Sequence, residues 1–158
     1  MHLRWLARLL LPVLRRYAAG RAPSVVIGGA ASPYLLRWHL LPRNPLCNLY
    51  LHRFLRSDDD RALHDHPWVS ASLILSGGYI EHRPTGPRWL LPGDLVVRGA
   101  RSAHRVALRR DADSCPVWTL FLTGPRVREW GFHCPGGWRH WRAFTAGPDG
   151  TTIGRGCD

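Results

Sequence analysis

The sequence predicts an all-β protein with one amphipathic helix in front of it, and two observations lead to this prediction. Sixteen Gly and 13 Pro interrupt 158 residues, which favours short strands joined by turns over long helices. From residue 25 onward, short β-prone runs alternate with turn signals such as Gly77-Gly78 and Pro92-Gly93-Asp94. Strands at this spacing form a sandwich or a barrel, and closure into a barrel is the better way to remove exposed edges. The chain length fits one domain.

Residues 2 to 17 predict the helix, and residues 1 to 24 are expected to form a basic amphipathic helix and its linker. We favour docking of this helix on the barrel or on a second subunit, which would give a homodimer, and we expect no membrane partner. A membrane-surface anchor and an Arg-rich transit peptide remain the alternatives, because all three share a basic amphipathic pattern. The apolar face carries Leu3, Leu6, Leu10, Val13, Leu14 and Tyr17, opposite Arg4, Arg8 and Arg15.

Residues 25 to 146 are expected to form the barrel, and residues 147 to 158 a flexible tail. Within the barrel, the Trp-rich segment from Gly124 to Phe144 is expected to wrap back over the strands as an arm. The predicted strands cover 25 to 27, 34 to 41, 48 to 55, 68 to 75, 79 to 83, 88 to 91, 94 to 98, 103 to 108 and 117 to 122.

The net charge of +11 is unevenly distributed, since residues 1 to 57 hold nine Arg and no acid. This basic third keeps nucleic-acid binding open as an alternative function, although Arg-rich composition alone explains it equally well. Apolar runs are interrupted by Arg before they reach membrane-spanning length. The four cysteines, Cys47, Cys115, Cys134 and Cys157, are too sparse for a disulfide scaffold, so a reducing cytoplasm is the expected location.

Three histidines carry the strongest chemical signal. In His64-Asp65-His66 the two imidazoles are two residues apart, so on a strand both point to the same face and can reach one ion. The Gly93-Asp94 turn leads into a further strand, and a short loop after it delivers His104 as a third imidazole. For a single histidine we favour a structural role, but this combination favours a metal site.

These motifs resemble those of the cupin superfamily, over about residues 48 to 122. The HxH pair with Gly77 eleven residues after His66 fits the first cupin motif, and Gly93-Asp94 with His104 fits the second. The resemblance implies a jelly-roll barrel, the double-stranded β-helix. Ser70 stands where the first motif usually has a glutamate ligand. The stretches HDHPW, SLILSGGYIEH and WGFHCPGGWRHW are also similar to short phage and bacterial cupin-like proteins, a likeness that names no substrate.

Three neutral imidazoles leave the full charge on a divalent ion and make it a strong Lewis acid. Resemblance to three-histidine cupins such as the thiol dioxygenases favours Fe(II) and a dioxygenase that acts on a small chelating substrate. Zn, Ni or Mn remain open as the metal. The alternatives are a redox-neutral isomerase, epimerase or lyase, and a nucleic-acid-associated protein. Ser70 in the glutamate position is also compatible with a site that has lost its chemistry.

Four further residues are candidates for substrate chemistry. His52 and Arg53 are neighbours on a strand, so one of them faces the interior, where His52 could orient substrate or Arg53 could clamp a carboxylate. Tyr79 and Glu81 share a face and are candidates for acid or base work. Asp65 is expected to support the ligands rather than bind the ion. Surface-loop positions are expected for His133, Cys134 and His140.

Overall fold

Short strands make up most of the regular structure in the computed structural model, which describes residues 2–29, 32–58, 62–108, 116–147 and 154–158. Asp59, Asp60, Arg61 and Cys115 lie outside the described residues. The elements are α1 (Arg4–Ala19), β1 (Val25–Ile27), β2 (Leu35–His39), β3 (Asn48–Phe54), β4 (Leu63–His64), β5 (Ser70–Ser76), β6 (Tyr79–His82), β7 (Arg88–Leu90), β8 (Leu95–Arg98), β9 (Arg105–Leu108), β10 (Val117–Thr123), β11 (Gly131–Cys134), β12 (Gly137–His140) and α2 (Trp141–Phe144).

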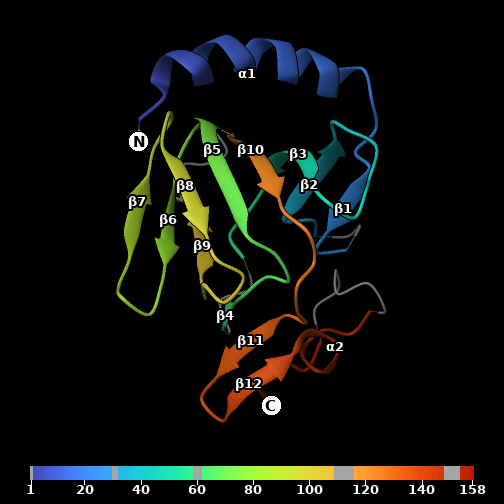
Figure 1. Cartoon of the computed structure of the whole chain (residues 1–158), viewed down its shortest axis with the longest axis vertical. Coiled ribbons are helices and arrows are strands. Elements are labelled where there is room, and N and C mark those ends of the chain that lie inside the picture. Colours follow the sequence, from blue (N-terminus) through green and yellow to red (C-terminus); the bar gives the residue numbers. More distant parts are fainter. Residues whose placement is uncertain (1, 30–31, 59–61, 109–115, 148–153) are drawn as a thin grey trace.

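The strands pair antiparallel in three sheets (Figure 1). The largest has the order β1-β2-β3-β10-β5-β8, and the smaller ones are β7-β6-β9 and β12-β11-β4. The nine predicted strands are confirmed, each with ends within two residues of those predicted. The strand bounds predicted from the sequence leave out β4, which is two residues long and ends at His64 of the HxH pair. They also leave out the β11–β12 hairpin and α2, which lie in the Trp-rich arm.

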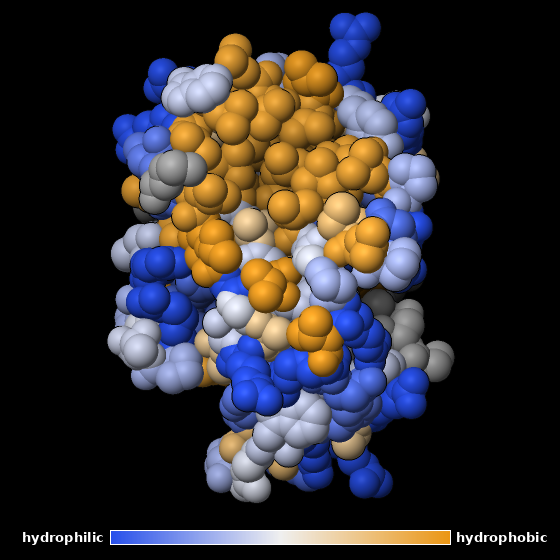
Figure 2. Space-filling model, in the orientation of Figure 1, coloured by the Kyte–Doolittle hydropathy of each residue, from blue (hydrophilic) through white to orange (hydrophobic). Residues whose placement is uncertain are grey.

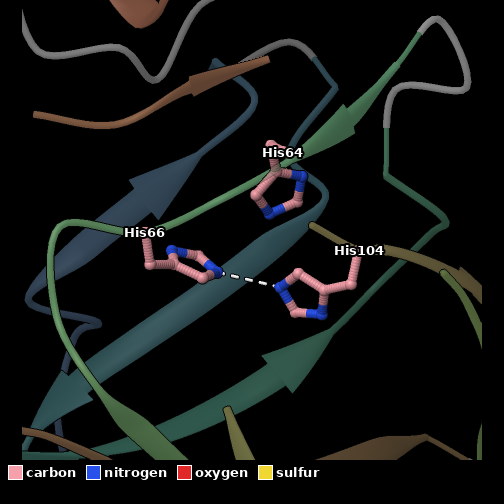
Figure 3. Close-up of side chains that lie close together, drawn as sticks. All are labelled: His64, His66 and His104. Carbon is pink, nitrogen blue, oxygen red and sulfur yellow. Dashed lines mark hydrogen bonds between the residues drawn. The ribbon is translucent and has the colours of Figure 1, made fainter. Parts of the chain in front are cut away.

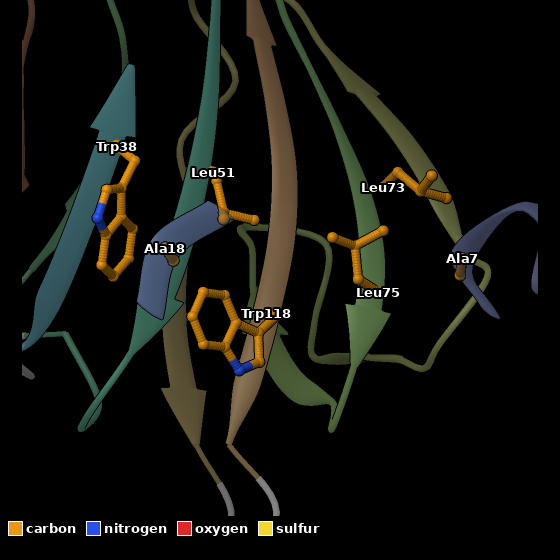
Figure 4. Close-up of a cluster of buried hydrophobic side chains, with 7 residues drawn as sticks. All are labelled: Ala7, Ala18, Trp38, Leu51, Leu73, Leu75 and Trp118. Carbon is orange, nitrogen blue, oxygen red and sulfur yellow. The ribbon is translucent and has the colours of Figure 1, made fainter. Parts of the chain in front are cut away.

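Helix α1 docks on the outer face of the large sheet, as favoured from the sequence. Ala7 and Ala18 of α1 lie in one apolar cluster with Trp38, Leu51 and other sheet residues (Figure 4). The turn before β8 anchors the start of the helix, because the backbone N–H of Leu3 donates to the carbonyl of Gly93 at 2.5 Å. Val13, predicted on the packed face, is 66% exposed, because the helix turns that position away from the sheet.

Strand alternation separates the two faces of the large sheet. On β10, Trp118 packs in the outer cluster under α1, whereas Thr119 and Phe121 line an internal cavity. Figure 2 shows apolar residues gathered across the upper part of the molecule, where Figure 1 places α1 and the adjoining sheet. No helix in the described part of the chain is long and apolar enough to cross a membrane.

The Trp-rich arm packs at the end of the molecule opposite α1 (Figure 1). A disulfide joins Cys134 on β11 to Cys157, and Arg139 donates to the carbonyl oxygen of Gly156 at 2.6 Å. These contacts tie residues 154–158, part of the segment expected to be a flexible tail, to the arm. The sparse cysteine spacing did not predict this disulfide, because its two cysteines are 23 residues apart and meet only when the arm folds.

Candidate metal centre

Two ligand-bearing segments are joined directly through their backbones. The N–H of His64 donates to the carbonyl of His104, and the N–H of His104 donates back to His64, both at 2.9 Å. The prediction that one strand carries the whole HxH pair is only partly right, since β4 ends at His64. His66 lies just beyond it, where its N–H donates to the carbonyl of Ala100 at 3.3 Å.

The three predicted imidazoles converge. One nitrogen from each of His64, His66 and His104 lies within 4.8 Å of the other two. The Nε2 atoms of His66 and His104 are 2.9 Å apart, and Figure 3 shows all three rings directed toward one point. Residues 38 positions apart are thus brought to a single site, with the bridge between His64 and His104 joining the two segments that carry them.

Glu81 holds the ring of His104 from behind. Its Oε1 lies 3.0 Å from His104 Nδ1 and 2.5 Å from Arg98 Nε, and the carboxylate is 1% exposed. A carboxylate can only accept, so His104 carries its proton on Nδ1 and presents the Nε2 lone pair to the site. Glu81 was a candidate for acid or base work, but its contacts are those of a group that orients a ligand.

Burial keeps the three histidines in the neutral form that binds metals. Desolvation lowers the pKa of His64 and takes the pKa of His66 well below its usual value. Desolvation also lowers the pKa of His104, to about 4, although the hydrogen bond to Glu81 opposes the shift. Burial alone would raise the pKa of Glu81, but His104 and Arg98 lower it to about 2, so it remains a carboxylate.

This donor set fits one divalent ion. Neutral imidazoles suit zinc, iron, nickel and copper, and three of them on one side leave positions open on the other. Ser70 is buried in the usual place of a carboxylate ligand, and its hydroxyl has no hydrogen-bond partner among the described residues. Within the described part of the chain, the three histidines therefore form the site without a carboxylate ligand.

The ligands open onto a cavity of about 480 Å³. Its walls are mostly aromatic and aliphatic, which suits a small organic ligand with an apolar part. The lining includes Val25, Ile27, Tyr34, Leu35, Arg37, His52, Phe54, Arg56, Asp58, His64, His66, Trp68, Ser72, Tyr79, Arg98, His104, Val106, Thr119, Phe121, Trp130, Phe132 and Phe144.

Strand β3 turns His52 into this cavity and Arg53 away from it. His52 is 4% exposed, and its Nε2 accepts a hydrogen bond from Arg37 Nε at 2.9 Å. Arg53 lies over the ring of Trp118, at 5.6 Å from its centroid, on the face that α1 covers. The structure therefore does not bring Arg53 to the site that sequence reasoning suggested for it.

Three cavity residues were missed by sequence reasoning. Arg37 faces His52 across β2 and β3, and Tyr34 and Asp58 also line the cavity. Burial raises the pKa of Asp58, and Asp58 Oδ2 accepts the N–H of Val106 at 2.8 Å. Burial, reinforced by the Asp58 carboxylate, also raises the pKa of Tyr34. Of the predicted pocket residues, Tyr79 does line the cavity, and its hydroxyl lies 3.4 Å from Arg98.

Asp65 supports the site from outside, as expected, by joining it to the arm. Its Oδ1 accepts the N–H of Gly131 at 2.9 Å, and its Oδ2 lies 2.8 Å from Arg128. Trp138 Nε1 donates to the same Oδ2 at 3.1 Å, and His133 Nε2 lies 3.3 Å from it. These contacts fix the arm to Asp65, which lies between His64 and His66 in the sequence. Trp130 and Phe132 of the arm line part of the cavity. His140 pairs instead with Glu129, away from this carboxylate.

Comparison with solved structures identifies the fold. The chain is similar to a cupin-2 domain from Rhodospirillum rubrum, with 15% identity over 72% of this chain and 76% of that chain, at a TM-score of 0.56. It is also similar to a sugar phosphate isomerase of the cupin superfamily from Silicibacter pomeroyi, with 16% identity over 85% and 91% of the two chains and a TM-score of 0.52. A third similar structure is the DMSP lyase DddQ from Ruegeria pomeroyi, with 19% identity, 73% and 58% coverage and a TM-score of 0.54. No protein-family model and no curated protein matches the chain.

Proposed function

We propose that this chain, which has the cupin fold, is a metal-dependent enzyme that converts a small chelating substrate by a redox-neutral isomerisation, epimerisation or elimination. The observation that carries the proposal is the meeting of three neutral imidazoles with proton-bearing side chains in one cavity. A divalent ion held by His64, His66 and His104 would act as a Lewis acid that polarises a carbonyl or carboxylate of the substrate.

Tyr34 and Asp58 supply the groups that such a reaction needs. Isomerisation and elimination both begin with removal of a proton from carbon, and the base must lie beside the polarised group. Asp58 lines the same cavity as the ligands, and its raised pKa brings the carboxyl group closer to the range in which it can take and return a proton. Tyr34 lines the same cavity and interacts electrostatically with Asp58, so its hydroxyl can pass on the proton that Asp58 accepts.

Two of the similar structures support this reaction class. One is named a sugar phosphate isomerase and the other a DMSP lyase, and neither isomerisation nor elimination requires an external oxidant. Because their identity to this chain is low, their names suggest a class of reaction to test but no substrate.

An Fe(II) dioxygenase is the second candidate, and the donor set favours it. With Ser70 in place of a carboxylate, three neutral ligands would hold the ion, as in the three-histidine cupins that the sequence resembles. This candidate has no need of Tyr34 or Asp58 as proton carriers.

Reloading the metal-free protein separately with Zn(II) and Fe(II) distinguishes the two candidates. Each form is incubated without oxygen in ²H₂O with a panel of hydroxy acids, keto acids and sugar phosphates, and NMR follows turnover and deuterium incorporation. We expect anaerobic turnover that Asp58→Asn abolishes without loss of metal, while Glu129→Gln, an exposed carboxylate control, keeps it. Turnover with Fe(II) that requires and consumes oxygen would instead establish the dioxygenase.

A further inference from the structure

We propose that Arg37 forms an anion subsite in the cavity, and that the substrate is a small carboxylate with an apolar body whose carboxylate binds this guanidinium. This subsite rests on the proposed function, in which the cavity is the substrate site. It does not require that the metal be bound.

Arg37 is held in place without being neutralised. Its Nε donates to His52 Nε2 at 2.9 Å, and its guanidinium carbon lies 4.8 Å from the centroid of the Tyr50 ring. Among the described residues, no carboxylate lies within 4.0 Å of Arg37, and neither terminal nitrogen donates a hydrogen bond. The two terminal nitrogens are therefore left for a ligand, and each offers one N–H in the parallel arrangement that a carboxylate matches.

The other arginines of the cavity already have partners. Arg98 contacts Glu81, Ser72 and Tyr79, so its charge and its donors are satisfied within the protein. Arg56 donates to the carbonyl oxygens of Ser32 and Ser57. A partly buried cation without a counter-ion is favourable for anion binding, so the arrangement at Arg37 is that of a site completed by an anion.

The position of Arg37 sets the size of the ligand. The ring of its partner His52 lies 5.0 Å from the Phe121 ring, and the ring of the ligand His66 lies 6.3 Å from the same phenyl ring. One aromatic side chain therefore separates the anion subsite from the candidate metal centre. A carboxylate at Arg37 with an apolar body over Phe121 would reach the ion with its other end.

Apolar lining favours a carboxylate over a phosphate. The rings of Phe54 and Phe121 lie 6.2 and 5.0 Å from the ring of His52, so the space next to His52 has few donors for the extra oxygens and second charge of a phosphate. A monocarboxylate can accept two parallel hydrogen bonds from Arg37, one from each terminal nitrogen, and its single charge matches that of the guanidinium.

Calorimetric binding of three probes of similar shape tests the subsite in metal-free protein. Benzoate carries a carboxylate, phenylphosphonate a doubly charged group, and benzamide no charge. We expect benzoate to bind best and Arg37→Gln to weaken it at least tenfold, which is about 1.4 kcal/mol. Arg37→Lys keeps a cation at the position, and we expect weaker benzoate binding there too, because an ammonium cannot donate two parallel bonds. Arg16→Gln removes an exposed charge on α1 and is the matched control.

Equal binding of benzoate by the wild type, Arg37→Gln and Arg37→Lys would overturn the subsite, as would tighter binding of phenylphosphonate or of benzamide. Because the assay uses metal-free protein, a failure of the anion subsite can be told apart from a failure of the proposed metal-dependent function. A chain that binds benzoate through Arg37 but never takes up a divalent ion would contradict the metal-dependent enzyme and leave the subsite intact.

Discussion

Glu81 Oε1 lies 3.0 Å from His104 Nδ1, and this contact makes a buried carboxylate part of the candidate metal centre without making it a ligand. The ring of His104 is thus fixed in rotation and in tautomer before any ion arrives. A hydrogen-bond acceptor in this position also makes the opposite nitrogen a better donor to a metal.

Replacing Glu81 by Gln should weaken metal binding by about 10- to 100-fold. The amide loses the negative charge and can present an N–H toward His104, so the preferred tautomer is no longer enforced. Metal affinity measured by competition with a chelator gives the result. Glu129→Gln, on an exposed loop, should leave the affinity unchanged, and equal affinities in both variants would show that Glu81 does not orient the ligand.

The free energy of unfolding of the metal-free protein should fall as the pH is lowered from about 6.5 toward 4. His104 has a pKa near 6.5 when unfolded and about 4 when folded, so the unfolded state binds more protons in this window. The shift corresponds to a loss on the order of 3 kcal/mol. Urea unfolding at a series of pH values measures this loss. In His104→Asn the free energy of unfolding should fall less steeply with decreasing pH. A free energy that stays constant across the window would be inconsistent with a buried neutral His104.

Removing the disulfide with Cys157→Ser should lower the free energy of unfolding by about 2 to 4 kcal/mol, because the bond closes a loop between residues 23 apart. Hydrogen exchange should quicken in β11 and β12. Cys47→Ser, which removes an exposed free thiol, is the control and should change neither measurement.

Asp65→Ala should destabilise the arm more than the barrel. It removes the acceptor for Gly131 N–H and leaves the partly buried Arg128 without its carboxylate, a change that costs about 3 to 5 kcal/mol at fully buried pairs. We expect faster hydrogen exchange in β11 and a smaller change in β10. Uniform acceleration in both strands would show that the arm and the barrel unfold together.

Much of the fold and the ligand set could be predicted from the sequence because their signals are local or carried by spacing. Turn residues mark the ends of the nine predicted strands, and the HxH pair with a histidine after the Gly93-Asp94 turn identified the three imidazoles that converge. The side of β3 that faces inward could not be predicted, since alternation gives two equivalent choices for His52 and Arg53.

Other features depend on contacts that no short pattern reveals. Arg37 enters the cavity because β2 pairs with β3 in a register that sets it opposite His52. No sequence pattern places Asp58 in the cavity, but its Oδ2 accepts the backbone N–H of Val106, and this contact holds it inside. The Cys134–Cys157 bond and the Asp65 contacts arise only when the arm folds back on the barrel.

Metal content and coordination of the purified protein give the sharpest test of the three-histidine centre. Protein prepared without oxygen or chelator is assayed by element-resolved mass spectrometry and X-ray absorption, beside His104→Ala. We expect one divalent ion per chain with three imidazole nitrogens around it, and loss of that ion in the variant. A wild-type chain that binds no divalent metal, or a variant that binds it equally well, would rule out a metal centre at these histidines.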